Sequence, residues 1–166
     1  MRISSLLAAV AWLTVSGASV QADFATTVQL GFARGLAAYD GGDYRTAFEE
    51  WRALAEAGDA EAQTALASLY VSGQGTPANP VQAVHWYRRA AEQGDAVAQQ
   101  NLGDFYGRGV GVGRDLVSAY VWLSLAADQG RRWAEWRRDD VAAQLSPERH
   151  AEAETRLAAR RVARDE

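Results

Sequence analysis

The chain of 166 residues contains no cysteine, and all 17 of its basic residues are arginine. Without cysteine it can form no disulfide, so an exported form has to be stabilised by packing alone. The same absence excludes a cysteine-anchored lipoprotein and leaves no thiolate ligand for zinc. Arginine in place of lysine favours bidentate pairing with carboxylates.

A long hydrophobic run is also missing. The apolar stretch from Leu6 to Val15 has about half of the ~20 residues needed to cross a bilayer. Met1-Arg2 places a positive charge before it, and Val20-Gln21-Ala22 places small or short residues before Asp23. These are the three parts of a secretory signal peptide. We expect residues 1–22 to be removed by cleavage after Ala22, giving a periplasmic or secreted protein; the alternative is an uncleaved membrane anchor.

The sequence has only two histidines and no net positive charge. The 21 acidic residues give a formal charge of −4, or −5 once Arg2 leaves with the signal peptide (−4 − 1 = −5). An acidic chain is a poor partner for nucleic acid or an anionic membrane, so we expect neither. His85 and His150 have no second histidine at i+3 or i+4, whereas zinc needs three or four converging ligands. The sequence therefore predicts no metal site and no cofactor.

What the chain does have is a repeat of 36 residues. Gly58-Asp59-Ala60 recurs as Gly94-Asp95-Ala96, and Gly130 follows at the same step (94 − 58 = 36, 130 − 94 = 36). A period in this range indicates stacked two-helix units, because one helical hairpin cannot bury its apolar face alone. Further positions keep the interval: Ala62, Gln63, Leu66 and Tyr70 return as Ala98, Gln99, Leu102 and Tyr106, and Ala47 returns as Ala83 and Ala119.

The apolar residues of each unit follow helical spacing, so the sequence predicts an all-α fold, an α-solenoid of about four antiparallel helix hairpins. Asp59 and Asp95 stand where an N-cap side chain accepts a free backbone N–H. Ser146-Pro147 opens the last helix, since proline is tolerated in the first turn. We expect helices at about residues 24–40, 43–57, 60–72, 80–93, 96–107, 116–129, 132–145 and 147–163.

Two segments carry a family resemblance. One has Leu102-Gly103, Tyr106, Gly109-Val110-Gly111, Asp115, Ala119, Trp122, Ala126-Ala127 and Gly130; the other has Leu66, Tyr70, Gly73, Gly75, Ala83, Trp86-Tyr87, Ala90-Ala91 and Gly94. Each resembles a Sel-one-like repeat (SLR), a relative of the tetratricopeptide repeat, although Ala67 stands where the family usually has glycine. The resemblance implies a right-handed superhelix and a role as adaptor or scaffold.

The first hairpin departs from this pattern and is similar to a plain tetratricopeptide unit. Its distance from Gly35 to Ala47 is 12 residues, against 16 from Gly103 to Ala119. The expected organisation is therefore a signal peptide (1–22), a tetratricopeptide-like first hairpin (23–57), two Sel-one-like repeats (58–130) and a C-terminal capping hairpin (131–166).

Two segments could suggest a catalytic or ligand-binding site, but neither has the pattern that such a site needs. The glycine-rich stretch from Gly107 to Gly113 follows no strand and completes no G-x-G-x-x-G, so it is expected to be a turn that needs positive φ. Glu49-Glu50 could form a carboxylate pair for glycan cleavage, but solvated helix faces produce such clusters routinely. We find no nucleophile with a base, and predict no catalytic residue.

Trp133 and Trp136, flanked by arginines, are the unusual pair of the sequence. In the 36-residue frame they occupy the positions of Val97 and Gln100, which on the first helix of a tetratricopeptide unit face the concave groove. Exposed there, they would be binding anchors of the type enriched in interface hot spots. Alternatively, both indoles lie under the last helix and cap the stack, which needs a closed end.

The sequence thus favours a non-enzymatic periplasmic adaptor that binds a partner protein or peptide through its concave face. The alternatives are a module that binds cell-wall glycan, with tryptophan stacking on sugar rings, and a peptidoglycan-active enzyme, which has the least support. The residues expected to line the concave face are Glu61, Thr64, Ser68, Val97, Gln100, Asn101, Asp104, Trp133 and Trp136.

Overall fold

Eight helices and no strand make up residues 26–165, the part of the chain that the computed structural model describes. The first of them, the N-terminal helix, is helical over residues 26–40. The others are α2 (Tyr44–Glu56), α3 (Ala60–Ser72), α4 (Pro80–Glu92), α5 (Ala96–Arg108), α6 (Leu116–Asp128), α7 (Arg132–Ala142) and α8 (Pro147–Asp165). The expected signal peptide lies outside the described residues.

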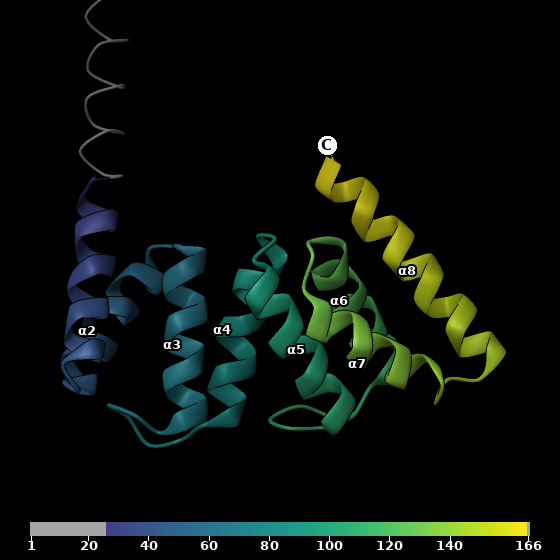
Figure 1. Ribbon diagram of the computed structural model, residues 1–166, viewed down its shortest axis with the longest axis horizontal. Helices are drawn as coiled ribbons and strands as arrows, with labels where there is room; N and C mark the ends of the chain where they lie inside the picture. Colours follow the sequence, from purple (N-terminus) through teal and green to yellow (C-terminus); the bar gives the residue numbers. More distant parts are fainter. Residues whose placement is uncertain (1–25, 166) are drawn as a thin grey trace, which may run out of the picture.

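The helices form a row of hairpins, and each helix from α2 to α6 packs on the next along the chain (Figure 1). This confirms the predicted all-α solenoid. Most helix ends fall within a residue of those expected, but α7 ends at Ala142 rather than near residue 145. Gln144 N and Leu145 N bond to carbonyls three residues back, so the chain tightens into a turn before Ser146-Pro147.

Equivalent positions of the repeat build the core. Leu66 and Leu102 are completely buried, and so are the alanines that recur at Ala47, Ala83 and Ala119. Small side chains at these sites let neighbouring helices approach closely, and larger side chains fill the spaces between hairpins. The recurring glutamines are also buried: Gln63 donates to the carbonyl of Ala55, and Gln99 to that of Ala91.

Caps and turns repeat as well. Asp59 and Asp95 accept hydrogen bonds from the backbone N–H of Ala62 and Ala98, at 2.7 and 2.6 Å. The glycine-rich stretch begins in the last turn of α5, which ends at Arg108, and from Gly109 onward it forms the turn between α5 and α6, as predicted. Gly111 lies there at φ 68°, and a Cβ on it would stand 2.3 Å from the carbonyl oxygen of Pro80. Glycine is therefore needed at this position for both conformation and space.

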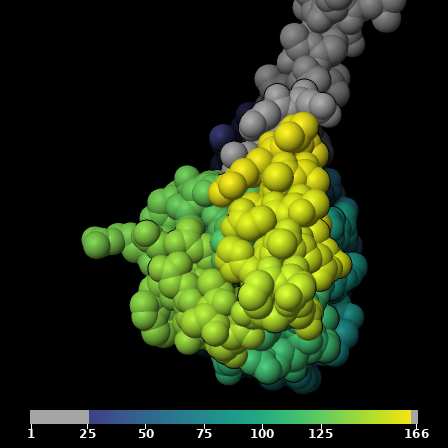
Figure 2. Space-filling model, turned by 90° about the vertical axis from the view of Figure 1, so that its right-hand side faces the viewer, coloured from purple at the N-terminus to yellow at the C-terminus, as the bar shows by residue number. Residues whose placement is uncertain are grey.

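The end of the stack differs from the capping hairpin expected over residues 131–166. Rather than pairing with α7, α8 packs on α6, and Figure 2 shows it in yellow across the end of the molecule. The reason is the outward face of α6, where Val121 and Leu125 replace the polar His85 and Arg89 of α4. Burying that apolar face is the favourable term that seats α8 there.

Named contacts fix α8 to α6. Leu157 of α8 is buried, and Arg161 forms a bidentate pair with Asp128 at 2.9 Å. The guanidinium of Arg160 lies 4.1 Å from the ring centroid of Trp122, within cation–π range. Among residues 26–165, no helix is long and apolar enough to span a membrane.

Candidate functional site

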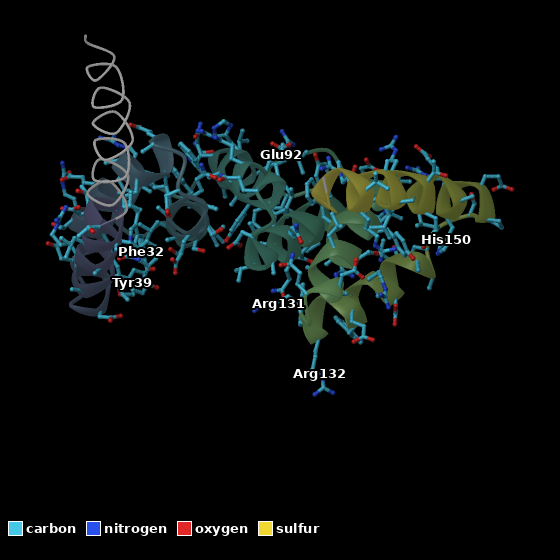
Figure 3. The ribbon with its side chains drawn as sticks, turned by 90° about the horizontal axis from the view of Figure 1, so that it is seen from above. Phe32, Tyr39, Glu92, Arg131, Arg132 and His150 are labelled. Carbon is cyan, nitrogen blue, oxygen red and sulfur yellow. The ribbon has the colours of Figure 1, made fainter. Side chains whose placement is uncertain are left out.

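One side of the stack is formed by the N-terminal helix, α3, α5 and α7; we call it the groove face. Figure 3 marks its two ends: Phe32 and Tyr39 on the N-terminal helix, and Arg131 and Arg132 at the start of α7. In the same view α8 lies on the opposite side of the stack. Because α8 packs on α6, it leaves the groove face open along successive repeats.

Three residues at equivalent positions form the first row of this face. Glu61, Val97 and Trp133 follow one another at 36-residue steps on α3, α5 and α7 (97 − 61 = 36, 133 − 97 = 36). All three are exposed, Val97 by 37% and Trp133 by 44%. Within the described residues none of their side chains makes a hydrogen bond or an ion pair, so the whole row is free to contact a ligand.

The second row consists of Thr64, Gln100 and Trp136. Two of these side chains already make hydrogen bonds within the protein. Thr64 Oγ1 donates to Asp95 at 3.1 Å, and Gln100 accepts from Arg131 Nε at 3.0 Å. Trp136 is 64% exposed. The first two residues therefore tie neighbouring helices together, and the third is open.

The other predicted groove residues also make internal bonds. Ser68 Oγ donates to the backbone oxygen of Thr64 and lies 3.0 Å from Tyr87 Oη. Burial raises the pKa of that tyrosine hydroxyl, although the bond with Ser68 works against the shift. Asn101 Nδ2 donates to the backbone oxygen of Val97 at 3.0 Å. These side chains line the face but have fewer free groups to offer.

The carboxylate of Asp104 forms ion pairs with two arginines. It pairs with Arg137 of α7 at 3.2 Å and with Arg108 at 3.1 Å, and the side chain of Asp104 is only 14% exposed. Arg137 also pairs with Asp140. This network joins α5 to α7 and balances the negative charge of Asp104.

The two indoles settle the question that the sequence left open. Trp133 and Trp136 lie on α7 with ring centroids 6.5 Å apart and planes inclined by 52°. The interpretation that both lie buried under the last helix is wrong, because α8 packs on α6 and leaves α7 uncovered. An exposed tryptophan pair on one helix face is the least expected feature of this surface.

The sequence analysis missed the N-terminal helix as part of the groove face. A surface hollow of about 630 Å³ is lined by Phe32 together with Glu61, Thr64 and Val97. Farther along the same helix, Tyr39 shares a second hollow with Ser68.

The signal for these residues was the shorter first turn. A Cβ on Gly35 would meet Trp51, just as a Cβ on Gly103 would meet Leu123, so the two glycines hold equivalent positions. One repeat before Gly103 stands Ala67 (103 − 36 = 67). Gly35 therefore corresponds to Ala67, at a step of 32 residues rather than 36 (67 − 35 = 32). The same step places Phe32 in the second row, beside Thr64 (64 − 32 = 32).

The structure shows no assembled reaction centre in residues 26–165. Glu49 and Glu50, the carboxylate pair considered for catalysis, are held by different arginines, Arg45 and Arg34. No group of three or more histidine, aspartate or glutamate residues in this part of the chain is arranged to hold a metal ion.

Helical hairpins stacked at a constant period, with one open face of equivalent positions, define a helical-repeat protein of the solenoid class. The Sel1 repeat family matches the chain twice, over residues 60–95 and 96–130. The chain is a Sel1-repeat protein, within the tetratricopeptide-like superfamily, as the resemblance implied. Proteins with this repeat generally mediate protein–protein interactions, and most act as non-enzymatic scaffolds.

Sixteen solved chains, including the following two, are similar to this one. A protective antigen present in uropathogenic Escherichia coli strains, which displays an SLR fold, gives a TM-score of 0.76 at 27% identity, covering 80% of this chain and 29% of its own. A Sel1 repeat protein from Oxalobacter formigenes gives 0.64 at 32% identity, covering 68% and 46%. This chain thus spans less than half of either relative. No curated protein sequence matches it.

Proposed function

We propose that this protein is a non-enzymatic periplasmic adaptor that binds a partner protein or peptide through its groove face. The observation that carries the proposal is the first row, Glu61, Val97 and Trp133. These residues repeat at the period of the fold, are exposed, and make no hydrogen bond or ion pair within the described residues. A row of this kind contacts an extended ligand at one point in each repeat.

The character of the exposed side chains supports a protein ligand. Tryptophan is enriched among the few residues that dominate protein–protein binding energy. The two exposed indoles at one end, Phe32 in the hollow at the other and polar side chains between them resemble the mixture of anchors and polar contacts found in such interfaces.

Capture experiments test the proposal. The wild-type protein, immobilised and exposed to periplasmic extract, should retain a defined protein identified by mass spectrometry. Glu61→Ala combined with Trp133→Ala should abolish retention, because both residues belong to the open row. The control is His85→Ala, an exposed residue on α4 outside the groove face. Equal retention by the groove variant and the wild type would contradict the proposal.

Export is the second part of the proposal and rests on the charged start, short apolar stretch and Val20-Gln21-Ala22. The protein recovered from the periplasm should begin at Asp23 when its N-terminus is sequenced. An intact Met1 end in the membrane fraction would instead support the uncleaved anchor.

The exposed tryptophan pair also favours one other function, binding of cell-wall glycan, since indoles stack on sugar rings. Retention of the pure protein on insoluble murein, lost in Trp133→Ala and Trp136→Ala, would establish this alternative. A peptidoglycan-active enzyme has little support, because Glu49 and Glu50 are engaged by separate arginines. We expect no cleavage of murein, β-lactams or peptides; turnover that depends on Glu49 or Glu50 would overturn that expectation.

A further inference from the structure

We propose that the α7 end of the groove face binds an acidic peptide segment, with a non-polar side chain of the peptide against the two indoles and its carboxylates on Arg131 and Arg132. This inference rests on the proposed function and names the chemistry of the partner. It follows from three features of α7 that α3 and α5 do not share.

The first feature is the exposed apolar surface. Of the tryptophans in the described residues, Trp51, Trp86 and Trp122 are buried, with at most 8% exposed, whereas Trp133 and Trp136 are 44% and 64% exposed. They stand three positions apart, so they share one side of the helix. With their rings 6.5 Å apart and inclined by 52°, they leave ring faces open to a ligand. A non-polar side chain laid there would remove apolar surface from water on both partners.

The second feature is a reversal of charge at the start of the helix. Asp59 and Asp95 precede α3 and α5, and Arg131 takes the equivalent position before α7. Ala60 and Ala96 correspond to Arg132. Figure 3 shows the Arg132 side chain reaching away from the body of the molecule. The position that is acidic in two repeats is thus basic in the third, beside the indoles.

The third feature is that these two arginines lack acidic partners. Arg132 makes no ion pair within the described residues, and the partner of Arg131 is the neutral amide of Gln100. The arginines that follow are neutralised: Arg137 by Asp104 and Asp140, and Arg138 by Asp139. Two guanidinium groups therefore remain available for carboxylates, which they bind in bidentate geometry.

The surrounding charges agree with an acidic ligand. On α5, the facing residues Val97 and Gln100 are uncharged, and Asp104 is already paired. On α7, Glu135 holds the position of the buried glutamines Gln63 and Gln99 but is exposed; it stands two residues from Trp133, so the two side chains do not face each other. The free carboxylate of the first row, Glu61, lies two repeats away. The charge along the face thus changes sign, so the acidic part of the peptide is set at α7.

The test uses random linear peptides displayed on phage and selected on the immobilised wild-type protein. Enriched peptides should combine Asp or Glu with an apolar or aromatic residue. Synthetic copies of the best binders should bind Trp133→Ala and Trp136→Ala about thirtyfold more weakly, the effect of losing a hot-spot residue of ~2 kcal/mol. Arg132→Glu should weaken binding at least about tenfold, and added salt should weaken binding to the wild type. The control is Arg45→Glu, another exposed arginine, which lies on α2.

The outcomes separate this inference from the proposed function. Selection of basic or uncharged peptides, or of no peptide, overturns the inference. So does binding that Glu61→Ala abolishes while the tryptophan variants bind normally, but that result leaves the adaptor function intact. If partner capture is also indifferent to every groove variant, both proposals fall. All these residues are exposed, so circular dichroism melting curves should match the wild type and exclude unfolding as the cause of lost binding.

Discussion

At the scale of the residue, equivalent positions in this protein divide into those that build the fold and those that are left free. Trp86 and Trp122 are one 36-residue step apart, and both are buried, with 8% and 5% of their surface exposed. Trp133 and Trp136 are the same residue type on an open face. The amino acid alone does not separate these roles; the position in the repeat does.

Replacing the buried tryptophans tests this division. Trp86→Ala and Trp122→Ala should each lower the free energy of unfolding by ~3–5 kcal/mol, because a large side chain is removed from a packed site. Urea titration followed by far-UV circular dichroism measures the change. Trp136→Ala is the matched control and should change stability by less than about 0.5 kcal/mol, as exposed substitutions do. A loss below about 1 kcal/mol at both buried sites would show that the repeat register is wrong.

At the scale of the element, α7 lacks the cap that starts α3 and α5. No side chain accepts a hydrogen bond from its first turn, and Arg131 and Arg132 place positive charge where the helix dipole favours negative charge. The helix thus carries a local cost that its two predecessors avoid. That cost is intelligible if the arginines serve binding, since functional sites commonly give up stability.

Arg131→Asp makes the two effects separable. The new carboxylate can accept from the first turn of α7 as Asp95 does in α5, so the protein should gain roughly 0.5–1 kcal/mol of stability despite losing the bond to Gln100. The same change should weaken binding of an acidic peptide at least about tenfold. Thermal unfolding and peptide titration of one variant measure both. Stability and affinity that fell together would contradict the capping argument.

The junction of α8 with α6 carries a group that responds to pH. Tyr120 donates a hydrogen bond to Glu154 at 2.5 Å; burial raises the pKa of this tyrosine, and the bond and charge of Glu154 raise it further. A raised pKa means that the folded state favours the protonated hydroxyl. Its contribution to stability is complete below the unfolded pKa near 10 and is lost as the pH rises through the folded pKa.

Unfolding in urea at several pH values between about 9 and 11 should therefore show a decline that is smaller in Tyr120→Phe. Tyr87, whose pKa burial also raises, should contribute separately, so Tyr87→Phe serves as a comparison outside the α6–α8 junction. Identical pH profiles for Tyr120→Phe and the wild type would show that Tyr120 does not couple α8 to proton binding.

At the scale of the whole molecule, the same contacts recur from one unit to the next. Gln93 donates to Gln63 at 2.8 Å, and Gln129 donates to Gln99 at 2.9 Å, thirty residues apart in both cases. Stability in such a stack is a sum of units and of contacts between neighbours. An entire unit can therefore be removed without creating a contact that the fold does not already contain.

Deleting residues 60–95, one full period, should give a shorter folded protein. Asp59 would then precede Ala96 and could cap α5, and Gln99 would meet the Ala55 carbonyl that Gln63 now uses. Far-UV circular dichroism should show helix in proportion to length and one cooperative transition at a lower temperature. Deleting residues 60–77, half a period, should not fold, since it joins mismatched helices. Equal behaviour of the two deletions would contradict the repeat boundaries.

Local signals made most of this architecture predictable. The period, the small residues at fixed positions and the caps at Asp59 and Asp95 act within one or two helices, so they can be identified in the sequence. Pairings between residues of different helices could not be predicted from the sequence. The ion pair between Asp104 and Arg137 depends on how α5 and α7 pack. The exposure of Trp133 depends on the packing of α8 on α6 rather than on α7. That Phe32 lies on the groove face could have been predicted from the shorter first turn, which sets the step to the next repeat at 32 residues.

The attachment of α8 to α6 has a mechanical consequence. A pulling force on the carboxyl end of the chain reaches α8 first and acts against a seat made by Leu157 and the pair between Arg161 and Asp128. Since α7 packs far more closely on α6 than on α8, peeling the last helix away need not strip α7 from the stack. The tryptophan-bearing end of the groove face therefore bears no load from a pull at the carboxyl end for as long as α8 stays docked on α6.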